Sequence, residues 1–315
     1  MRLVKPLLTM LLSAAALTAQ AEQKFVNVLT GGTSGVYYPM GVALSKLYGD
    51  ALPGAKVSVQ STKASAENVN LLQAGRGEVA FALGDTVSSA YQGDAEAGFK
   101  APLTKLRALA AIYPNYIQIV ASKESGIKTL ADLKGKRVSV GAPKSGTELN
   151  ARALFKAAGM SYEDFAKTEY LPFGESVELM KNRQLDATLQ SAGLGVASLR
   201  DLSTAIEIVV VAVPAEVVKN VGDAAYQASV IPANTYTGQA EDVPTATIRN
   251  ILVTHEGVDA DAVYAMTKAM FTHMDAMIAA HAAAKGIKLE QAAVGLPLPL
   301  HPGAERYYRE AGALK

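Results

Sequence analysis

The sequence predicts an α/β protein built as two lobes, each a mostly parallel sheet with helices on its faces. Strand-like and helix-like segments alternate along the chain, which is typical of parallel sheets whose strands are connected by helices. The chain has 315 residues, of which 50% are hydrophobic and 19% are charged. A globular chain of this length usually divides into domains of roughly 100–200 residues.

The first lobe is expected to begin with three strand–helix pairs. The strands are predicted at residues 24–29, 56–60 and 78–83, and the helices over residues 36–47, over 66–74 and opening at residues 84–86. Pro39 lies in the first turn of the first helix, where the missing N–H of proline is tolerated. Ser65 is placed to cap the second helix, which stops at Gly75.

The middle of the chain predicts the second lobe, followed by a return to the first. Strands are expected at residues 106–112 and 116–121 on either side of Pro114, and then at 137–140, 185–189, 206–211, 226–231 and 247–254. Helices are expected at residues 148–158 and 261–283. The last helix carries Met266, Met270 and Met274 at helical spacing, which predicts a face turned toward the core.

Residues 1–21 are predicted to be a secretory signal peptide. Arg2 and Lys5 precede an apolar run over residues 7–17, and Ala19 and Ala21 provide the small residues before a cut after Ala21. The run is shorter than the roughly 20 residues that span a membrane. We therefore expect an exported protein of the periplasm that is not embedded in the membrane.

Composition excludes several classes of partner and chemistry. The 30 Lys and Arg residues against 29 Asp and Glu give a net charge of +1, so no nucleic-acid partner is expected. The chain has no cysteine, which excludes disulfides, thiolate metal ligands and thiol nucleophiles. His273 and His281 are interpreted as packing or surface residues. No metal, cofactor or catalytic residue is predicted, and the protein is not expected to be an enzyme.

Three loops share one design, because each follows a strand, is rich in Gly, Ser and Thr, and precedes a helix. They cover residues 31–35, 61–65 and 145–147. The free N–H groups and the dipole at a helix N-terminus suit a carboxylate or phosphate. Each loop alone could equally be a capping turn. The loops can converge, since ligands of open parallel sheets bind at the carboxyl ends of the strands.

Motifs for nucleotide hydrolysis and metalloprotease chemistry are incomplete. Gly141 and Gly146 have the spacing of a P-loop, but Thr147 stands where the phosphate-contacting lysine belongs. His255-Glu256 lacks the second histidine of the zincin motif. No nucleophile is paired with a base in a recognisable pattern.

Four stretches of the chain are distinctive. They are LTGGTSGVYYPMG (29–41), STKASAENVNLL (61–72), VGAPKSGTE (140–148) and HPGAERYYRE (301–310). Together they resemble the TAXI family, the solute-binding subunits of tripartite ATP-independent periplasmic (TRAP) transporters. The resemblance spans essentially the whole chain after residue 21, and the first and last stretches are its most specific parts.

The resemblance implies a two-lobed periplasmic binding protein fold (type II-like) with two crossing hinge segments, near residues 111–117 and 229–234. Lobe I would hold residues 22–112 and 233–315, and lobe II residues 113–232. The implied function is that of a monomeric receptor. It would capture a small acidic solute, such as glutamate, 2-oxoglutarate or a similar dicarboxylate, and deliver it to a cation-driven TRAP permease.

The same resemblance implies the ligand-binding residues. They are Thr33, Ser34, Val36, Tyr37, Lys63, Ala64, Ser65, Asp85, Ser145, Gly146, Thr147, Gln190 and Gly193. Asp85 would receive an amino group of the solute, although its interpretation as a helix cap is equally open. The three loops hold no arginine, so we expect backbone dipoles and hydroxyls to bind the carboxylates rather than a bidentate clamp.

Two other functions stay open at this stage. A receptor that passes its signal to a membrane sensor would have the same fold, and it would differ in lacking a permease gene beside its own. An exported enzyme on this fold would need a catalytic base near a nucleophile.

Overall fold

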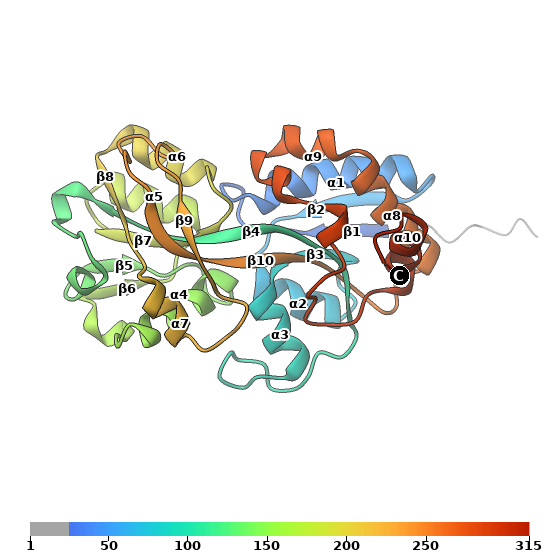
Figure 1. The fold of residues 1–315 in the computed structure, drawn as a ribbon, viewed down its shortest axis with the longest axis horizontal. Helices are drawn as coiled ribbons and strands as arrows, with labels where there is room; N and C mark the ends of the chain where they lie inside the picture. The colour runs from blue at the N-terminus through green and yellow to red at the C-terminus, as the bar shows by residue number, and fades with distance from the viewer. Residues whose placement is uncertain (1–24, 315) are drawn as a thin grey trace, which may run out of the picture.

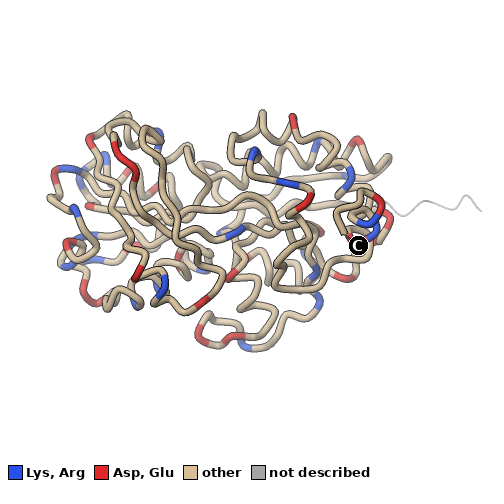
Figure 2. The backbone as a smooth tube through the Cα atoms, viewed as in Figure 1, with Lys and Arg blue, Asp and Glu red and all other residues tan. Residues whose placement is uncertain are grey.

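Two lobes lie next to each other and are joined by two long strands, β4 (Leu106–Ser122) and β10 (Val243–His255) (Figure 1). The computed structural model describes residues 25–314. The predicted signal peptide, residues 1–21, lies outside the described residues. Basic and acidic residues are distributed over both lobes (Figure 2).

The other strands within the described residues are β1 Phe25–Leu29, β2 Lys56–Gln60, β3 Val79–Leu83, β5 Arg137–Ser139, β6 Lys167–Glu169, β7 Ala187–Ala192, β8 Ile208–Val211 and β9 Gln227–Ile231. The α-helices are α1 Tyr37–Ala51, α2 Ser65–Gln73, α3 Gly84–Gln92, α4 Gly146–Ala157, α5 Phe173–Lys181, α6 Ala197–Ala205, α7 Ala215–Asn220, α8 Ala260–Thr272, α9 Met274–Ala280 and α10 Pro302–Glu310. Short 3-10 helices are η1 Lys123–Ser125, η2 Leu130–Leu133, η3 Tyr162–Asp164, η4 Ala282–Gly286 and η5 Leu289–Gln291.

The strands form one continuous mixed sheet in the order β2-β1-β3-β10-β4-β7-β5-β6, with β8 on β4 and β9 on β10. In one lobe β1 runs parallel to β2 and β3, and in the other β5 runs parallel to β6 and β7. The crossing strand β10 is antiparallel to both β3 and β4. The predicted fold class is confirmed, and the parallel pairs follow from the strand–helix alternation within each lobe.

The two strands predicted around Pro114 are a single strand, β4. Pro114 lies opposite Arg249 of β10, and the pairing register shifts between Arg249 and Ile251. A proline without an N–H donor is tolerated in a strand where a bulge interrupts the ladder. The break predicted from Pro114 is therefore wrong, and β4 continues past the proline to pair with β7 of the other lobe from Tyr116 onward.

The second crossing lies within β10. Its start, over Val243 to Thr247, pairs with β9 in lobe II, and Asn250 to Val253 pair with β3 in lobe I. The crossing expected near residues 229–234 is displaced, because β9 ends at Ile231 and the chain returns through a loop before β10 begins. The residue limits of the two lobes stay a prediction.

The long helix predicted over residues 261–283 is also interrupted. His273, between α8 and α9, has φ −128° and ψ 44°, and its Nδ1 lies 3.0 Å from the Ala269 carbonyl oxygen. The methionine face is nevertheless turned inward, as expected, with Met266, Met270 and Met277 buried in the core that α1, α8 and α10 share.

Each lobe has a buried apolar centre that holds the strand ends in place. All five residues of β3 are buried. In lobe II, Leu154 and Phe155 of α4 pack on the sheet together with Leu189 of β7. Over residues 25–314 no helix is long and apolar enough to cross a membrane.

Candidate functional site

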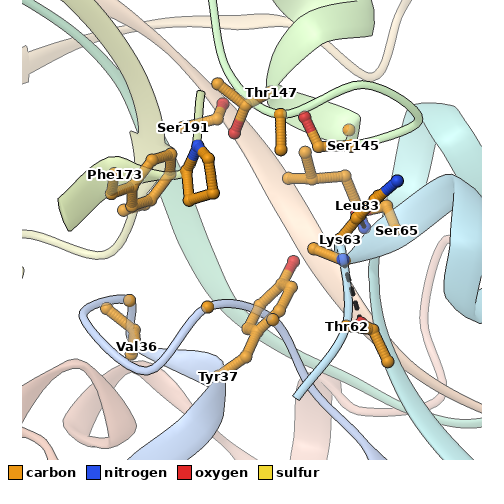
Figure 3. Close-up of a pocket in the computed structure, with 18 of the residues that line it drawn as sticks. Val36, Tyr37, Thr62, Lys63, Ser65, Leu83, Ser145, Thr147, Phe173 and Ser191 are labelled. Carbon is orange, nitrogen blue, oxygen red and sulfur yellow. Dashed lines mark hydrogen bonds between the residues drawn. The ribbon is translucent and has the colours of Figure 1, made fainter. Parts of the chain in front are cut away.

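A cavity of about 180 Å³ lies between the two lobes at the carboxyl ends of their parallel strands. Figure 3 shows Tyr37 reaching into it from lobe I, with Ser145, Thr147 and Ser191 of lobe II opposite. Its lining residues are Gly31, Gly32, Gly35, Val36, Tyr37, Ser61, Thr62, Lys63, Ala64, Ser65, Leu83, Asn115, Ala142, Ser145, Gly146, Thr147, Pro172, Phe173, Ser191 and Ala192.

Four helices begin at this cavity. Their first residues are Tyr37 of α1, Ser65 of α2, Gly146 of α4 and Phe173 of α5, and all four line the cavity. The first N–H groups of a helix have no intrahelical acceptor, and the helix dipole places partial positive charge there. Two helices from each lobe therefore direct partial positive charge at the same space, which favours an anionic occupant.

Some hydroxyl groups of the cavity wall donate a hydrogen bond to another protein group, and others do not. The Tyr37 hydroxyl donates to Asn250 Oδ1 (2.5 Å), and the Ser191 hydroxyl donates to Asn150 Oδ1 (2.5 Å). By contrast, the Ser65 and Ser145 oxygens accept backbone N–H groups, from Leu83 (3.1 Å) and Glu148 (3.1 Å). The Ser65 hydroxyl faces the Tyr37 oxygen, and the hydrogen of Ser145 is left for another acceptor.

Thr147 offers a second donor from lobe II. Its methyl group faces Gly141, where an added Cβ would lie 2.7 Å from Thr147 Cγ2. No hydrogen bond within residues 25–314 engages its hydroxyl, although the residue lines the cavity and is only 5% exposed. Because no protein group among the described residues takes this hydroxyl as a donor, it is available to a solute bound in the cavity.

The charge of the cavity wall is positive. Lys63 is the charged residue among those described that line it, and no Asp or Glu stands in the wall. Lys63 belongs to the loop before α2, whose own fold is fixed by Thr62, since the Thr62 oxygen accepts the Ala64 N–H (3.0 Å) and its hydroxyl donates to the Thr30 carbonyl (2.8 Å). A long-range attraction for anions thus adds to the helix dipoles.

Backbone strain occurs on both sides of the cavity. Ala64 has φ 70° and ψ −144°, and Lys144 has φ 62°. A non-glycine residue in this region costs of order 1–3 kcal/mol and persists only where its surroundings hold it. The two strained loops meet, because the Glu67 N–H donates across the lobes to the Lys144 carbonyl (3.2 Å).

The lobes are in contact over the cavity. A Cβ on Gly146 of α4 would lie 2.6 Å from Leu83 Cδ1 and 2.6 Å from Ser65 Oγ, both in lobe I. On the other side of the cavity, a Cβ on Gly174 of α5 would lie 3.7 Å from Ser34 Cβ. The structure is therefore the closed arrangement, and it depends on glycine at the closest approach.

Tyr37 links the cavity to the two crossing strands. Asn250 of β10, which accepts the Tyr37 hydroxyl, donates to Asn115 Oδ1 of β4 (2.7 Å) and to the Tyr113 carbonyl (2.8 Å). Asn115 in turn donates to the Ser191 carbonyl (2.9 Å). Burial raises the pKa of Tyr37, so its hydroxyl stays protonated and donating.

The structure places most of the predicted site residues in the cavity wall, and the others elsewhere. Those in the wall are Val36, Tyr37, Lys63, Ala64, Ser65, Ser145, Gly146 and Thr147. Thr33 and Ser34 line a neighbouring groove that they share with Gly174 and Glu175. Asp85, Gln190 and Gly193 are absent from the cavity wall.

Strand geometry explains the position of Gln190, and packing against η4 explains that of Gly193. Successive side chains of β7 point to opposite faces of the sheet. Ser191 therefore faces the cavity, and Gln190 faces α6, where it accepts the Ser198 hydroxyl (2.6 Å). Gly193 packs against η4, since a Cβ there would lie 2.9 Å from Ala283 Cβ.

Asp85 is buried behind the cavity wall. Its carboxylate accepts from Asn150 Nδ2 (2.5 Å), the Tyr226 hydroxyl (2.8 Å) and the Thr86 N–H (2.7 Å). It is therefore neither positioned to meet an amino group of a solute in the cavity nor the N-cap of α3, which is Leu83.

Sequence reasoning missed Phe173, Pro172, Ser191 and Asn115. Phe173 begins α5 after β6, the same strand–loop–helix arrangement as the other loops, but β6 is short and polar and was not recognised as a strand. Asn115 follows Pro114, where the sequence suggested a break.

Solved structures of other proteins share the fold. They include one described as a periplasmic transporter, with 12% identity over 92% of this chain and 93% of that chain and a TM-score of 0.57. A putative L-cystine ABC transporter from Listeria monocytogenes matches with 15% identity over 84% and 98% of the two chains and a TM-score of 0.52. The alkanesulfonate-binding protein SsuA from Xanthomonas axonopodis pv. citri, bound to MOPS, matches with 15% identity over 92% and 84% and a TM-score of 0.50.

At these identities the likeness concerns the two-lobed fold alone. The sequence itself gives the narrower assignment, because a family model described as the NMT1-like family matches residues 28–312. The match covers nearly all of the described residues, including every loop that lines the cavity. This chain therefore belongs to the NMT1-like family.

Proposed function

We propose that this protein is a periplasmic solute-binding receptor that encloses a small acidic solute between its lobes and delivers it to a membrane permease. One observation carries the proposal: the helices α1, α2, α4 and α5 begin at one interlobe cavity whose wall contains Lys63 and no acidic side chain. Lobe I and lobe II each supply part of the wall, so only the closed protein has the whole site.

The size and donors of the cavity support a small dicarboxylate. Its volume of about 180 Å³ is below the roughly 300–1,000 Å³ of sites for drug-sized ligands. Donors from lobe I, near Ser65, and from lobe II, near Thr147, suit a molecule with an anionic group at each end. No carboxylate in the wall is available for an amino group, which favours 2-oxoglutarate or a plain dicarboxylate over glutamate.

A thermal-shift screen over dicarboxylates, oxo-acids and amino acids tests the solute class. A solute at 100 times its dissociation constant adds roughly 2.7 kcal/mol to the stability of the folded protein. We expect five-carbon dicarboxylates and oxo-acids to raise the melting temperature most. A screen in which only neutral or cationic solutes raise it would contradict the proposal.

The permease is proposed to be of the cation-driven TRAP type, on the resemblance of residues 29–41 and 301–310 to the TAXI family. The alternative is an ATP-driven permease, since one structural neighbour is described as an ABC transporter. Uptake of labelled solute by spheroplasts supplied with the purified receptor separates the two. An ionophore that collapses the cation gradient abolishes TRAP uptake while ATP is still present.

A further inference from the structure

A polar contact joins the two lobes behind the cavity wall. Asp85, in the first turn of α3 in lobe I, accepts hydrogen bonds from two residues of lobe II. Asn150 Nδ2 on α4 lies 2.5 Å from its Oδ2, and the Tyr226 hydroxyl, just before β9, lies 2.8 Å from the same oxygen. These contacts exist only while the lobes are together.

The same contact reaches the cavity. Asn150 accepts the hydroxyl of Ser191, a lining residue, at 2.5 Å. Asn150 also lies on α4, whose first residues Gly146 and Thr147 form the lobe II wall. A change at Asp85 therefore acts on the elements that close over the solute.

The surroundings of Asp85 are poor in positive charge. The residue is 6% exposed and forms no ion pair among the described residues. The ionisable groups near it are Tyr37 from α1 and Tyr226 and Asp223 from lobe II. Arg249 on β10, which packs against α3, directs its guanidinium to the Val294 carbonyl (3.0 Å).

Burial is the main influence on this carboxyl group. Burial, and to a smaller degree the nearby Asp223, raises the pKa of Asp85, while the hydrogen bonds from Tyr226, Thr86 and Asn150 lower it, and the net result is a pKa of about 6. When the lobes separate, Asn150 and Tyr226 withdraw and water reaches the carboxylate. Its pKa then returns toward the ordinary aspartate value of about 3.9.

We propose that Asp85 takes up a proton as the lobes close, so that the closed receptor is favoured in mildly acidic medium. The sign follows from linkage, because the state that binds the proton more tightly gains as the pH falls. The gain is complete below the pKa of the open state and is lost as the pH rises through about 6. Between pH 7 and pH 5 the closing equilibrium should increase about tenfold.

Disulfide trapping measures the closed fraction without any solute. The chain has no cysteine, so a Ser34→Cys, Gly174→Cys pair is the only thiol pair present. The Cβ separation of 3.7 Å in the closed structure is that of a disulfide. The rate of closure of this disulfide, with 4,4′-dithiodipyridine as oxidant, follows the population of the closed state even where that population is small.

The comparison is made at each pH between this double-cysteine protein and the same protein with the further change Asp85→Asn. Thiol chemistry is identical in both, so the ratio of their trapping rates isolates Asp85. We expect the trapping rate of the protein that keeps Asp85, divided by the rate of the Asp85→Asn variant, to rise about tenfold from pH 7 to pH 5. A ratio that is flat or falls over this range overturns the proposal.

A second experiment keeps Asp85 and introduces Tyr226→Phe into the double-cysteine protein. Removing this hydrogen bond from the carboxylate should move the pH-dependent rise of the trapping rate to higher pH, which a merely structural contact would not do. If the midpoint of the pH dependence of the trapping rate does not move, or moves to lower pH, Asp85 is not the group that takes up the proton. Because no solute takes part, failure of the proposed solute to bind would leave these results unchanged.

Discussion

Thr147 is the side chain whose loss should weaken solute binding most clearly. Thr147 lines the cavity and its hydroxyl has no hydrogen-bond partner within the described residues, whereas the hydroxyls of Tyr37 and Ser191 have already donated to asparagines. Thr147→Val keeps the methyl group against Gly141 and removes only the donor. A hydrogen bond to a charged group contributes about 1.5–3 kcal/mol, so calorimetry should show at least about tenfold weaker binding.

Thr33→Val is the matched control for that experiment. Thr33 lies in the neighbouring groove and outside the cavity wall, although the sequence suggested a contact with the solute. The Thr33→Val variant should bind the solute with the same affinity as the unchanged protein. Equal losses in both variants would show that threonine hydroxyls act on stability rather than on the solute.

Ala64 should be replaceable by glycine with a gain in stability. Its φ of 70° and ψ of −144° belong to a region that glycine enters readily and alanine does not. The free energy released by relieving this strain exceeds the entropic cost that glycine adds by making the unfolded chain more flexible. Ala64→Gly should therefore raise the free energy of unfolding by about 1 kcal/mol. Denaturant unfolding measures it, and a lower midpoint would contradict the strain argument.

The strand–loop–helix units were the part of the site that sequence could predict. Residues 61–65 and 145–147 carry Ser, Thr and Gly between a strand and a helix, and the structure places both loops at the cavity. The unit before α5 was missed because β6 is short and its residues are polar. Gln190 was predicted in place of Ser191 because all six residues of β7 are buried and both of its faces carry polar residues, Thr188 and Gln190 on one and Ser191 on the other, so the sequence pattern does not show which face meets the cavity.

Closure of the two lobes depends on the close contact that Gly146 of α4 makes with lobe I. A Cβ there would lie 2.6 Å from Leu83 Cδ1 and from Ser65 Oγ in the opposite lobe, while α4 itself tolerates alanine. Gly146→Ala should therefore leave the melting temperature of the free protein nearly unchanged and weaken solute binding by at least about tenfold, because the lobes no longer meet.

Gly49→Ala serves as the control for Gly146→Ala. Gly49 lies in α1, and an added Cβ there meets nothing within 4 Å. Small-angle scattering with and without solute should show that solute makes the Gly49→Ala variant more compact. The Gly146→Ala variant should become compact to a smaller degree. Full compaction of Gly146→Ala on adding solute would show that the contact is not limiting.

For the molecule as a whole, the alternation of strands and helices was enough to predict two lobes that each contain a mostly parallel sheet. The crossings were harder to place, since they rest on long-range pairing. Pro114 suggested the end of a strand, but the pairing of β4 with β10 carries the strand past it at a bulge. Asp85 was the other error, because only the contact between lobes shows that its carboxylate is already bound by Asn150 and Tyr226.

Calorimetric titration of the purified protein with glutarate and with its uncharged diamide, glutaramide, tests the central claim most directly. The two molecules match in length and differ in charge. If helix N-termini and Lys63 hold an anion between the lobes, glutarate or its 2-oxo derivative binds and glutaramide binds at least about 100-fold more weakly. Equal affinity for the acid and the diamide, or binding of the diamide alone, would contradict an anion site in this cavity.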